Sequence, residues 1–175
     1  MERTGRDAAL GSTAAGEVAG LIASNLLPAL AGCRTAVRRF LDARTPGAIV
    51  NVSSHQAQRA VRGALPYATA KAAVEGLTRA LAVDYGPRRI RVNAVALGSI
   101  STERYQAYLG QHEPGEAARI EAEMARLHPL GRVGQPEEAA AAIAFLLSGE
   151  ASFINGAILP VDGGRSALGR DPEEA

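Results

Sequence analysis

The chain has 175 residues, a formal net charge of +1 at pH 7, and 47% hydrophobic but only 4% aromatic residues. This length and composition suit one soluble globular domain, and the near-neutral charge with few aromatic side chains argues against nucleic acid as a partner. The single cysteine, Cys33, excludes an internal disulfide and a cysteine-cluster metal site, so the sequence favours a reducing cytoplasm.

Hydrophobic periodicity predicts alternating helices and strands along most of the chain. Pro136, which two glutamates follow, marks a helix start, because proline and negative charge both suit a first turn. Apolar runs rich in β-branched residues mark buried parallel strands. The expected elements are a helix over residues 17–43, a strand over 47–54, a helix over 67–85, a strand over 89–95, a short helix over 116–127, a helix over 136–148 and a strand over 157–161.

Two of the predicted strands end in polar segments that can contact a ligand. The strand over residues 47–54 ends at Ser54, and the strand over residues 89–95 leads into a polar segment at residues 97–102. A helix separates the two strands, so we expect them to be parallel and joined by a right-handed crossover. Ligands of open α/β sheets bind at the carboxyl ends of parallel strands, which places both segments at one candidate site.

The helix between these strands carries the most informative pair, Tyr67 and Lys71. Lys71 is the sole lysine of the chain, against eighteen arginines, and it stands four positions after one of four tyrosines. Residues at this spacing share one face of a helix, so the phenol and the ammonium can point into the same cleft. A compact ammonium holds a phenolate and a sugar hydroxyl together better than a planar guanidinium does.

This pair suggests proton transfer by a tyrosine. A free phenol has a pKa of about 10 and is a poor base at neutral pH, so a neighbouring cation is needed to lower that pKa. An isolated pair of this kind is more often two exposed side chains on a solvated helix face. Ser54 lies thirteen residues before Tyr67, at the end of a predicted strand, and this position favours the catalytic interpretation.

Five ordered segments add a more specific signal. They are Ile49-Val50-Asn51-Val52-Ser53-Ser54, Tyr67-Ala68-Thr69-Ala70-Lys71, Arg91-Val92-Asn93-Ala94-Val95, His128-Pro129-Leu130-Gly131-Arg132, and Asn155-Gly156 with Val161-Asp162-Gly163-Gly164. With these segments, the sequence from Asn25 to Gly164 resembles the short-chain dehydrogenase/reductase family. The resemblance implies an α/β fold, here a partial doubly wound Rossmann-like fold with about three parallel strands and flanking helices.

The resemblance also implies a role for each matching residue in an alcohol/carbonyl oxidoreductase that uses NAD or NADP. Tyr67 would be the general acid/base that gives a proton to a carbonyl oxygen, or takes one from an alcohol. Ser54 would hydrogen-bond the same oxygen. Lys71 would lower the phenol pKa and hold the ribose hydroxyls, so that both Tyr67 and Lys71 contact the cofactor. Asn25 would organise a water relay between the lysine and solvent.

The segment after the second strand would line the nicotinamide. By the resemblance, Gly98, Ile100 and Thr102 would contact it, and Ile100 would offer backbone groups to the carboxamide. Leu97 stands where the family usually has proline. The backbone before Gly98 therefore loses a fixed φ, and a looser cofactor pocket is expected.

The glycine-rich phosphate turn of this family has no clear counterpart in the chain. No two glycines are separated by a single residue, so neither Thr-Gly-x-x-x-Gly-x-Gly nor G-x-G-x-x-G is intact. We therefore expect the chain to hold the catalytic and substrate half of the family's domain, without the N-terminal nucleotide-binding half. The residue that selects NAD or NADP would lie in that half, so the sequence does not distinguish the two.

We expect one domain over residues 1–175, with flexible ends at 1–15 and 165–175 and a substrate lid at 103–127. The resemblance implies a small alcohol or carbonyl substrate, which the sequence does not name, and a homo-oligomer, either a dimer or a tetramer. The longest apolar run, residues 139–147, is too short to cross a bilayer, so we expect a cytoplasmic protein without membrane contact.

Other chemistry has weaker support. His55 follows Ser54, but adjacent residues on an extended segment point apart and the chain has no Gly-x-Ser-x-Gly turn, which argues against a serine hydrolase. His112 and His128 lack metal-ligand neighbours at close spacing, so no metal site is expected. One alternative stays open: an inactive fragment of the family that acts, if at all, as an oligomerisation or partner-binding module.

Overall fold

Three strands, β1 (Gly47–Ser54), β2 (Ile90–Leu97) and β3 (Ile158–Val161), form a parallel sheet in the order β1-β2-β3. The computed structural model describes residues 14–169. β2 is the central strand and is buried along most of its length. The sheet confirms the predicted α/β class and the predicted set of about three parallel strands flanked by helices.

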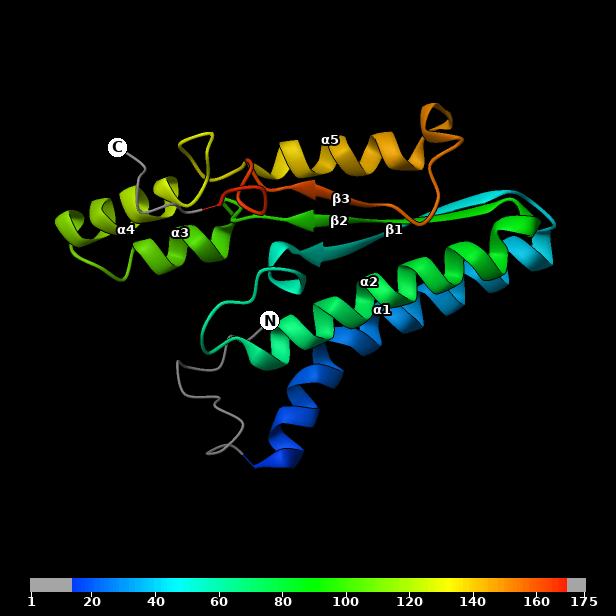
Figure 1. The fold of residues 1–175 in the computed structure, drawn as a ribbon, viewed down its shortest axis with the longest axis horizontal. Coiled ribbons are helices and arrows are strands. Elements are labelled where there is room, and N and C mark those ends of the chain that lie inside the picture. Colours follow the sequence, from blue (N-terminus) through cyan, green and yellow to red (C-terminus); the bar gives the residue numbers. More distant parts are fainter. Residues whose placement is uncertain (1–13, 170–175) are drawn as a thin grey trace.

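The helices form layers on both faces of this sheet (Figure 1). α1 (Ala15–Ala43) and α2 (Leu65–Tyr85) cover one face, and α5 (Pro136–Leu147) covers the other. α3 (Glu103–Leu109) and α4 (Pro114–Arg126) lie beyond the carboxyl ends of the strands. Because the site residues follow these strand ends, α3 and α4 lie on the same side of the molecule as the candidate site.

Each helix layer packs on the sheet through its own apolar cluster. On the α2 face, Ile90 and Val92 are fully buried against Ala82. On the α5 face, Val95 packs against Leu146, and both are at most 1% exposed. A central parallel strand with both faces covered reads as a continuous apolar run, which is why the pattern predicted β2 correctly.

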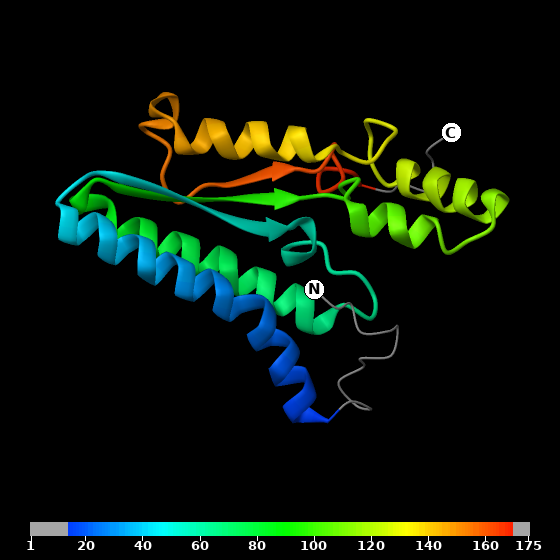
Figure 2. The same cartoon turned by 180° about the vertical axis from the view of Figure 1, so that it is seen from behind.

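α1 differs from the other helices in its length and its exposure. It has 29 residues with Pro28 inside it, and only Val18, Cys33 and Val37 are buried. Figures 1 and 2 show its first part bending away from α2, and a proline removes a helix hydrogen bond at such a bend. By length and composition alone, α1 is the one described helix that could cross a membrane, although buried core helices of soluble proteins and N-terminal signal sequences meet the same test.

The segment between β2 and α5 departs most from the sequence prediction. The pattern predicted one short helix over residues 116–127, whereas the structure has α4 from Pro114 and a second helix, α3. The hydroxyl of Thr102 accepts a hydrogen bond from the N–H of Tyr105 and so caps α3. α3 has only seven residues, too few for a helical period to be visible. The flexible ends expected at 1–15 and 165–175 lie mostly outside the described residues.

Polar side chains join β2 to the segment that leads into β3. The Arg91 guanidinium donates to the carbonyl oxygens of Leu146 and Ser148, both at 2.9 Å, at the end of α5. Asn93 donates to the carbonyl of Ile154 and accepts from the N–H of Ala157, each at 2.9 Å. The sequence segment Arg91–Val95, which carries part of the resemblance, therefore also acts as a structural connection.

Candidate active site

Ser54 is the last residue of β1, where the chain turns into η1 (His55–Ala57). Its side chain is 5% exposed, and its Oγ accepts a hydrogen bond from the N–H of Gln56 at 3.2 Å. Serine commonly caps a helical turn in this way, so the local sequence fixes where the hydroxyl lies. The hydroxyl hydrogen remains free to turn toward a ligand oxygen.

Tyr67 and Lys71 lie on consecutive turns of α2. The helix begins at Leu65 with Pro66 in its first turn, where the missing N–H of proline costs nothing. The Lys71 ammonium lies 5.7 Å from the centroid of the half-buried Tyr67 ring. A cation at this distance from an aromatic ring is attracted to it. The predicted spacing therefore does bring the phenol ring and the ammonium together.

The hydrogen bond of Lys71 goes to the backbone of β1. Its Nζ donates to the carbonyl oxygen of Val52 at 2.9 Å, and the residue is only 9% exposed. Burial lowers the pKa of Lys71, because the charged ammonium has lost water. The sequence alone gives no sign of this backbone partner.

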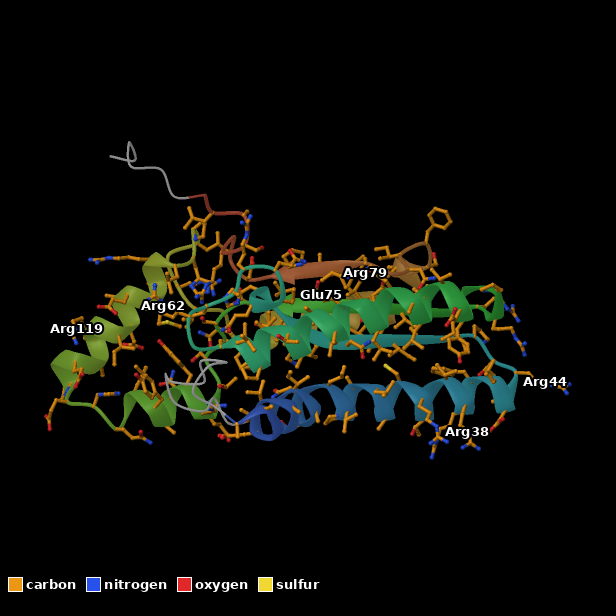
Figure 3. The ribbon with its side chains drawn as sticks, turned by 60° about the horizontal axis from the view of Figure 1, so that its bottom comes forward. Arg38, Arg44, Arg62, Glu75, Arg79 and Arg119 are labelled. Carbon is orange, nitrogen blue, oxygen red and sulfur yellow. The ribbon has the colours of Figure 1, made fainter. Side chains whose placement is uncertain are left out.

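Glu75 lies one turn beyond Lys71 on the same face of α2 and is 4% exposed. Its carboxylate accepts hydrogen bonds from Ser53 at 3.2 Å and from Gln58 at 3.3 Å, and Arg79 lies 3.9 Å away. Figure 3 shows Glu75 and Arg79 on this helix. These bonds hold the end of β1 and the loop after η1 against α2. In the sequence, Glu75 stands four positions after Lys71, and this spacing is the signal that could have placed it on the same helix face.

Asn25 lies on α1, and its described hydrogen bonds stay within that helix. Its Nδ2 donates to the carbonyl of Leu21 at 2.8 Å and to the Ser24 hydroxyl at 3.4 Å. Its Oδ1 is buried without a hydrogen-bond partner among the described residues. No direct hydrogen bond among residues 14–169 joins Asn25 to Lys71, and the relay through water that the resemblance implies stays a prediction.

The predicted cofactor contacts at the end of β2 also have roles inside the chain. A Cβ on Gly98 would lie 2.7 Å from the Cα of Asp162, so only glycine fits between β2 and β3 here. Ile100 pairs with Gly134 in an isolated parallel bridge whose bonds involve the residues flanking Ile100. The N–H of Ile100 is therefore directed away from Gly134 and can serve a ligand. Thr102 caps α3 as described above.

Two buried histidines lie near the strand ends. His55 is 5% exposed, and its Nδ1 lies 3.3 Å from the carbonyl oxygen of Leu97. A carbonyl only accepts hydrogen bonds, so Nδ1 carries the proton and Nε2 is an acceptor, for which residues 14–169 offer no partner. Burial, with a smaller contribution from Arg165, lowers the pKa of His55 to about 4. The neighbouring Gln56 also has a buried Oε1 without a partner in this part of the chain.

The second histidine, His128, connects α4 to the end of β2. Its Nδ1 donates to the carbonyl of Met124 at 2.7 Å, and its Nε2 accepts from the N–H of Ser99 at 3.2 Å. The ring is 3% exposed. α4, the second helix of the predicted lid, is thereby tied to the segment that carries Ile100. A histidine before proline in sequence gives no sign of such a contact.

Two cavities lie at opposite ends of the sheet. A cavity of about 220 Å³ at the carboxyl ends is lined by Ile100, Asp162 and Gly163 among others. A larger open groove of about 1020 Å³ at the amino ends is lined by residues that include Phe40 and Arg89. Neither of these two cavities is lined by Ser54, Tyr67 or Lys71. Within the described part of the chain, no group of three or more His, Cys, Asp or Glu residues could hold a metal ion.

The arrangement around β1 and α2 has the parts that proton transfer needs. A phenol lies beside a buried ammonium, and a serine hydroxyl ends the neighbouring strand. A phenol is able to donate and accept a proton, and a hydroxyl beside it is able to hydrogen-bond the same substrate oxygen.

Comparisons with known proteins give consistent findings. The profile of a family described as enoyl-(acyl carrier protein) reductase matches residues 3–166. The chain is 43% identical to 3beta-hydroxysteroid dehydrogenase 1 of Eggerthella lenta over 146 residues, covering 80% of this chain and 51% of that protein. It is 44% identical to cis-4-hydroxycyclohexanecarboxylate dehydrogenase of Sinomonas cyclohexanicum over 142 residues, covering 81% and 54%. The chain thus spans about half the length of these curated relatives.

Solved structures agree with this result. The ligand-free aldohexose dehydrogenase of Thermoplasma acidophilum superposes with a TM-score of 0.84 at 36% identity, over 95% of this chain and 65% of that one. ElxO with NADP bound superposes with a TM-score of 0.82 at 31% identity, over 93% and 63%. Both superpositions include the described sheet and its helices.

Proposed function

Because the chain belongs to the short-chain dehydrogenase/reductase family, we propose that it interconverts an alcohol and a carbonyl compound, with Tyr67 as general acid/base. One observation carries the proposal: the ammonium of the chain's one lysine lies beside the Tyr67 ring, one helix turn away, and bonds to the strand that ends at Ser54. The relatives named above are dehydrogenases, so the comparisons do not favour an inactive binding module.

Each residue of the proposed site has a distinct task. Tyr67 donates its proton to the carbonyl oxygen in reduction and accepts one from the alcohol in oxidation. The Ser54 hydroxyl donates a hydrogen bond to the same oxygen as negative charge develops on it. Lys71 stabilises the phenolate form of Tyr67 by its charge.

The chain fits the nicotinamide end of an NAD or NADP cofactor, which supplies or accepts the hydride when it is bound. The N–H of Ile100, directed away from Gly134, suits the carboxamide. Lys71 is the donor available for ribose hydroxyls, and Gly98 keeps the backbone close to β3. ElxO is a similar protein with NADP bound, and this supports a nicotinamide cofactor without choosing between the two forms.

We further propose a cytoplasmic homo-oligomer, a dimer or tetramer, that acts on a small alcohol or carbonyl compound. Apolar side chains on α1 are exposed, with Leu27 at 54% and Leu30 at 44%. Apolar side chains gathered on one helix commonly mark a contact with another chain.

Replacement of Tyr67 tests the proposed function. Tyr67→Phe should lower the turnover of carbonyl compounds with NADH or NADPH by roughly 100-fold to 10,000-fold, because the proton donor is lost. Cofactor affinity, measured by fluorescence titration of the reduced cofactor, should change less than about twofold, because the ring remains. Tyr85→Phe is the matched control, since Tyr85 lies at the other end of α2 in the apolar cluster. Unchanged turnover in Tyr67→Phe would refute the assigned role.

A further inference from the structure

α4 is held in place mainly by its C-terminal end. It runs from Pro114 to Arg126, and none of its side chains is buried. Figure 1 shows α3 and α4 beyond the carboxyl ends of the strands, away from the helix layers that cover the sheet. A helix without a buried face gains little stability from packing, so polar contacts at its end have a large share in fixing its position. His128, two positions after the end of α4, supplies such a contact.

The imidazole of His128 bonds to two segments at once. Its Nδ1 donates to the carbonyl oxygen of Met124 at 2.7 Å, and its Nε2 accepts from the N–H of Ser99 at 3.2 Å. The last carbonyl groups of a helix lack a partner in the helix ladder, so the first bond closes the end of α4. The second bond reaches the segment that follows β2. The ring is 3% exposed, so both bonds are shielded from water.

The chemistry of the partners and the packing around the ring fix its orientation. A carbonyl only accepts hydrogen bonds and an N–H only donates them, so the His128 ring is neutral and carries its proton on Nδ1. Gly163, in the turn after β3, lies against the ring: a Cβ there would be 3.4 Å from Cβ of His128 and 3.6 Å from Cδ2. Its φ of 60° also favours glycine. The ring therefore has little freedom to turn.

The bond to Ser99 sets the direction of the Ile100 N–H. In an extended segment, the N–H and C=O of one residue point to one side, and those of the next residue point to the other. The Ser99 N–H points to His128, and its C=O accepts from the N–H of Gly134 at 2.9 Å. The N–H of Ile100 is thus directed to the opposite side, where the nicotinamide carboxamide is proposed to bind.

We propose that His128 is a positioning residue that couples the predicted substrate lid to the nicotinamide contact. The ring holds the N–H of Ser99, and so directs the N–H of Ile100, while it moves with the end of α4. A shift of α4 that admits or covers a substrate therefore changes the direction of the Ile100 N–H. By linkage, cofactor binding affects the lid to the same degree. This inference rests on the nicotinamide site of the function proposed above and not on the role of Tyr67.

Two substitutions of His128 separate its two bonds. In His128→Asn, the amide nitrogen takes the place of Nδ1 and keeps a donor for Met124, while Ser99 loses its acceptor. In His128→Gln, the longer side chain brings an oxygen to the place of Nε2 and keeps an acceptor for Ser99, while the donor for Met124 is lost. His112→Asn and His112→Gln are the matched controls, because His112 follows α3 and bonds to Glu116 of α4.

Hydrogen exchange of the backbone amides reports on the two bonds without any ligand. The Ser99 amide should exchange roughly tenfold faster in His128→Asn than in the wild type, and about as slowly as the wild type in His128→Gln. The amides in the last turn of α4 should exchange faster in His128→Gln only. A purely structural role would speed up both sets of amides in both variants. Equal exchange of the Ser99 amide in the two variants would overturn the assigned bond.

Nicotinamide mononucleotide is the cofactor probe, because it carries the nicotinamide and its ribose without the adenylate half of the cofactor. Titration followed by the amide signal of Ile100 should give a dissociation constant about three- to tenfold higher in His128→Asn than in the wild type. His128→Gln and both controls should stay within about twofold. An Ile100 signal that does not respond in the wild type would overturn the nicotinamide contact and the coupling with it.

The coupling itself is tested by the effect of the probe on α4. In the wild type, the mononucleotide should slow amide exchange in the last turn of α4. This effect should vanish in both variants of His128, because each lacks one of the two bonds, and it should persist in both variants of His112. Its persistence in either variant of His128 would overturn the coupling. One folded variant is enough for this comparison.

These readouts do not depend on turnover. If Tyr67→Phe keeps its activity while the two variants of His128 differ as stated, the proposed function fails and the coupling stands. If Tyr67→Phe loses its activity and the two variants of His128 bind the mononucleotide equally, the proposed function stands and the coupling fails.

Discussion

Two regions of this protein use buried polar side chains in opposite ways. In the β2–β3 seam, formed by Arg91, Asn93 and Asn155, the polar side chains bond to backbone groups of neighbouring segments. At the β1 terminus, formed by Ser54, His55 and Gln56, two buried acceptor atoms have no partner within the described part of the chain. A buried group without a hydrogen bond costs stability, so residues that leave it unpaired are candidates for binding.

The difference follows from what surrounds each region. The seam lies between the central strand and the end of α5, where the chain folds back on itself and the amide of Asn155 can reach the carbonyl of Ala82. The β1 terminus lies beside the edge of β1 that pairs with no described strand, where the described chain offers fewer backbone partners. The seam therefore holds the fold together, whereas the β1 terminus leaves buried acceptors unbonded among the described residues.

The largest effect should come from breaking the seam. Asn93→Ala removes two hydrogen bonds and leaves the N–H of Ala157 without its partner, whereas the carbonyl of Ile154 keeps a bond from Arg91 at 3.3 Å. The unpaired N–H costs about 1 to 3 kcal/mol and the lost bond to Ile154 about 1 kcal/mol more, so the free energy of unfolding should fall by up to about 4 kcal/mol. Denaturation by urea measures this change. A loss below about 1 kcal/mol would mean that water replaces the amide and that the seam is not closed by Asn93.

His55 allows the β1 terminus to be tested by pH. Its pKa lies at about 4 in the folded chain, below the ordinary value of 6.5, because burial disfavours the charged ring. The folded state thus binds fewer protons, and its stability is full above pH 6.5 and falls as the pH drops toward 4. A difference of this size corresponds to roughly 3 kcal/mol.

The matched variant is His55→Asn, which keeps a donor for the carbonyl of Leu97 and does not titrate. Thermal denaturation should show that wild-type stability falls between pH 6.5 and 4. The stability of the variant should show no such fall. His112→Asn, which changes an imidazole outside the β1 terminus, should retain that fall. A wild-type profile that is flat over this range would show that His55 is not buried as a neutral ring.

Most of the fold was predictable because it depends on local patterns. The strand at 47–54 and the helix end at Tyr85 match the structure, since both depend on apolar periodicity and on turn residues. α3 was missed, because its start depends on a single cap at Thr102. The part of α1 before Pro28 is exposed on most of its surface, so its pattern did not reveal which neighbour covers it.

The candidate site was only partly predictable, for a physical reason. The spacing of Tyr67 and Lys71 on a helix fixes their shared face, and the structure shows that proximity. The bond from Lys71 to Val52 depends on which edge of β1 is open, and sequence spacing carries no information about strand order. Asn25 is followed by Leu26, as the resemblance leads us to expect, but the place of Asn25 relative to Lys71 depends on how α1 bends. The roles of all these residues remain proposals.

The Glu138 carboxylate is hydrogen-bonded but lies at the surface, so it separates the effect of hydrogen bonds on stability from that of burial. Arg132 donates to both carboxylate oxygens of Glu138, at 2.8 and 2.7 Å, and the N–H of Gln135 donates to the same carboxylate at 2.7 Å. These bonds, with that of Arg132 foremost, lower the pKa of Glu138 to about 2. The side chains are 51% and 45% exposed, so solvent weakens the interaction.

The smallest effect is therefore expected for Glu138→Gln, which keeps an acceptor for Gln135 and removes the charge. The folded-state pKa is depressed, so the contribution of the charge is present above pH 4.5 and is lost as the pH falls toward about 2. Melting temperatures of wild type and variant should differ slightly at pH 7 and coincide near pH 2. Added salt should also reduce the difference at pH 7. If the difference in melting temperature persists at pH 2, Glu138 acts through its shape and not through its charge. Hydrogen bonds at an exposed position would then be enough to stabilise this fold without burial.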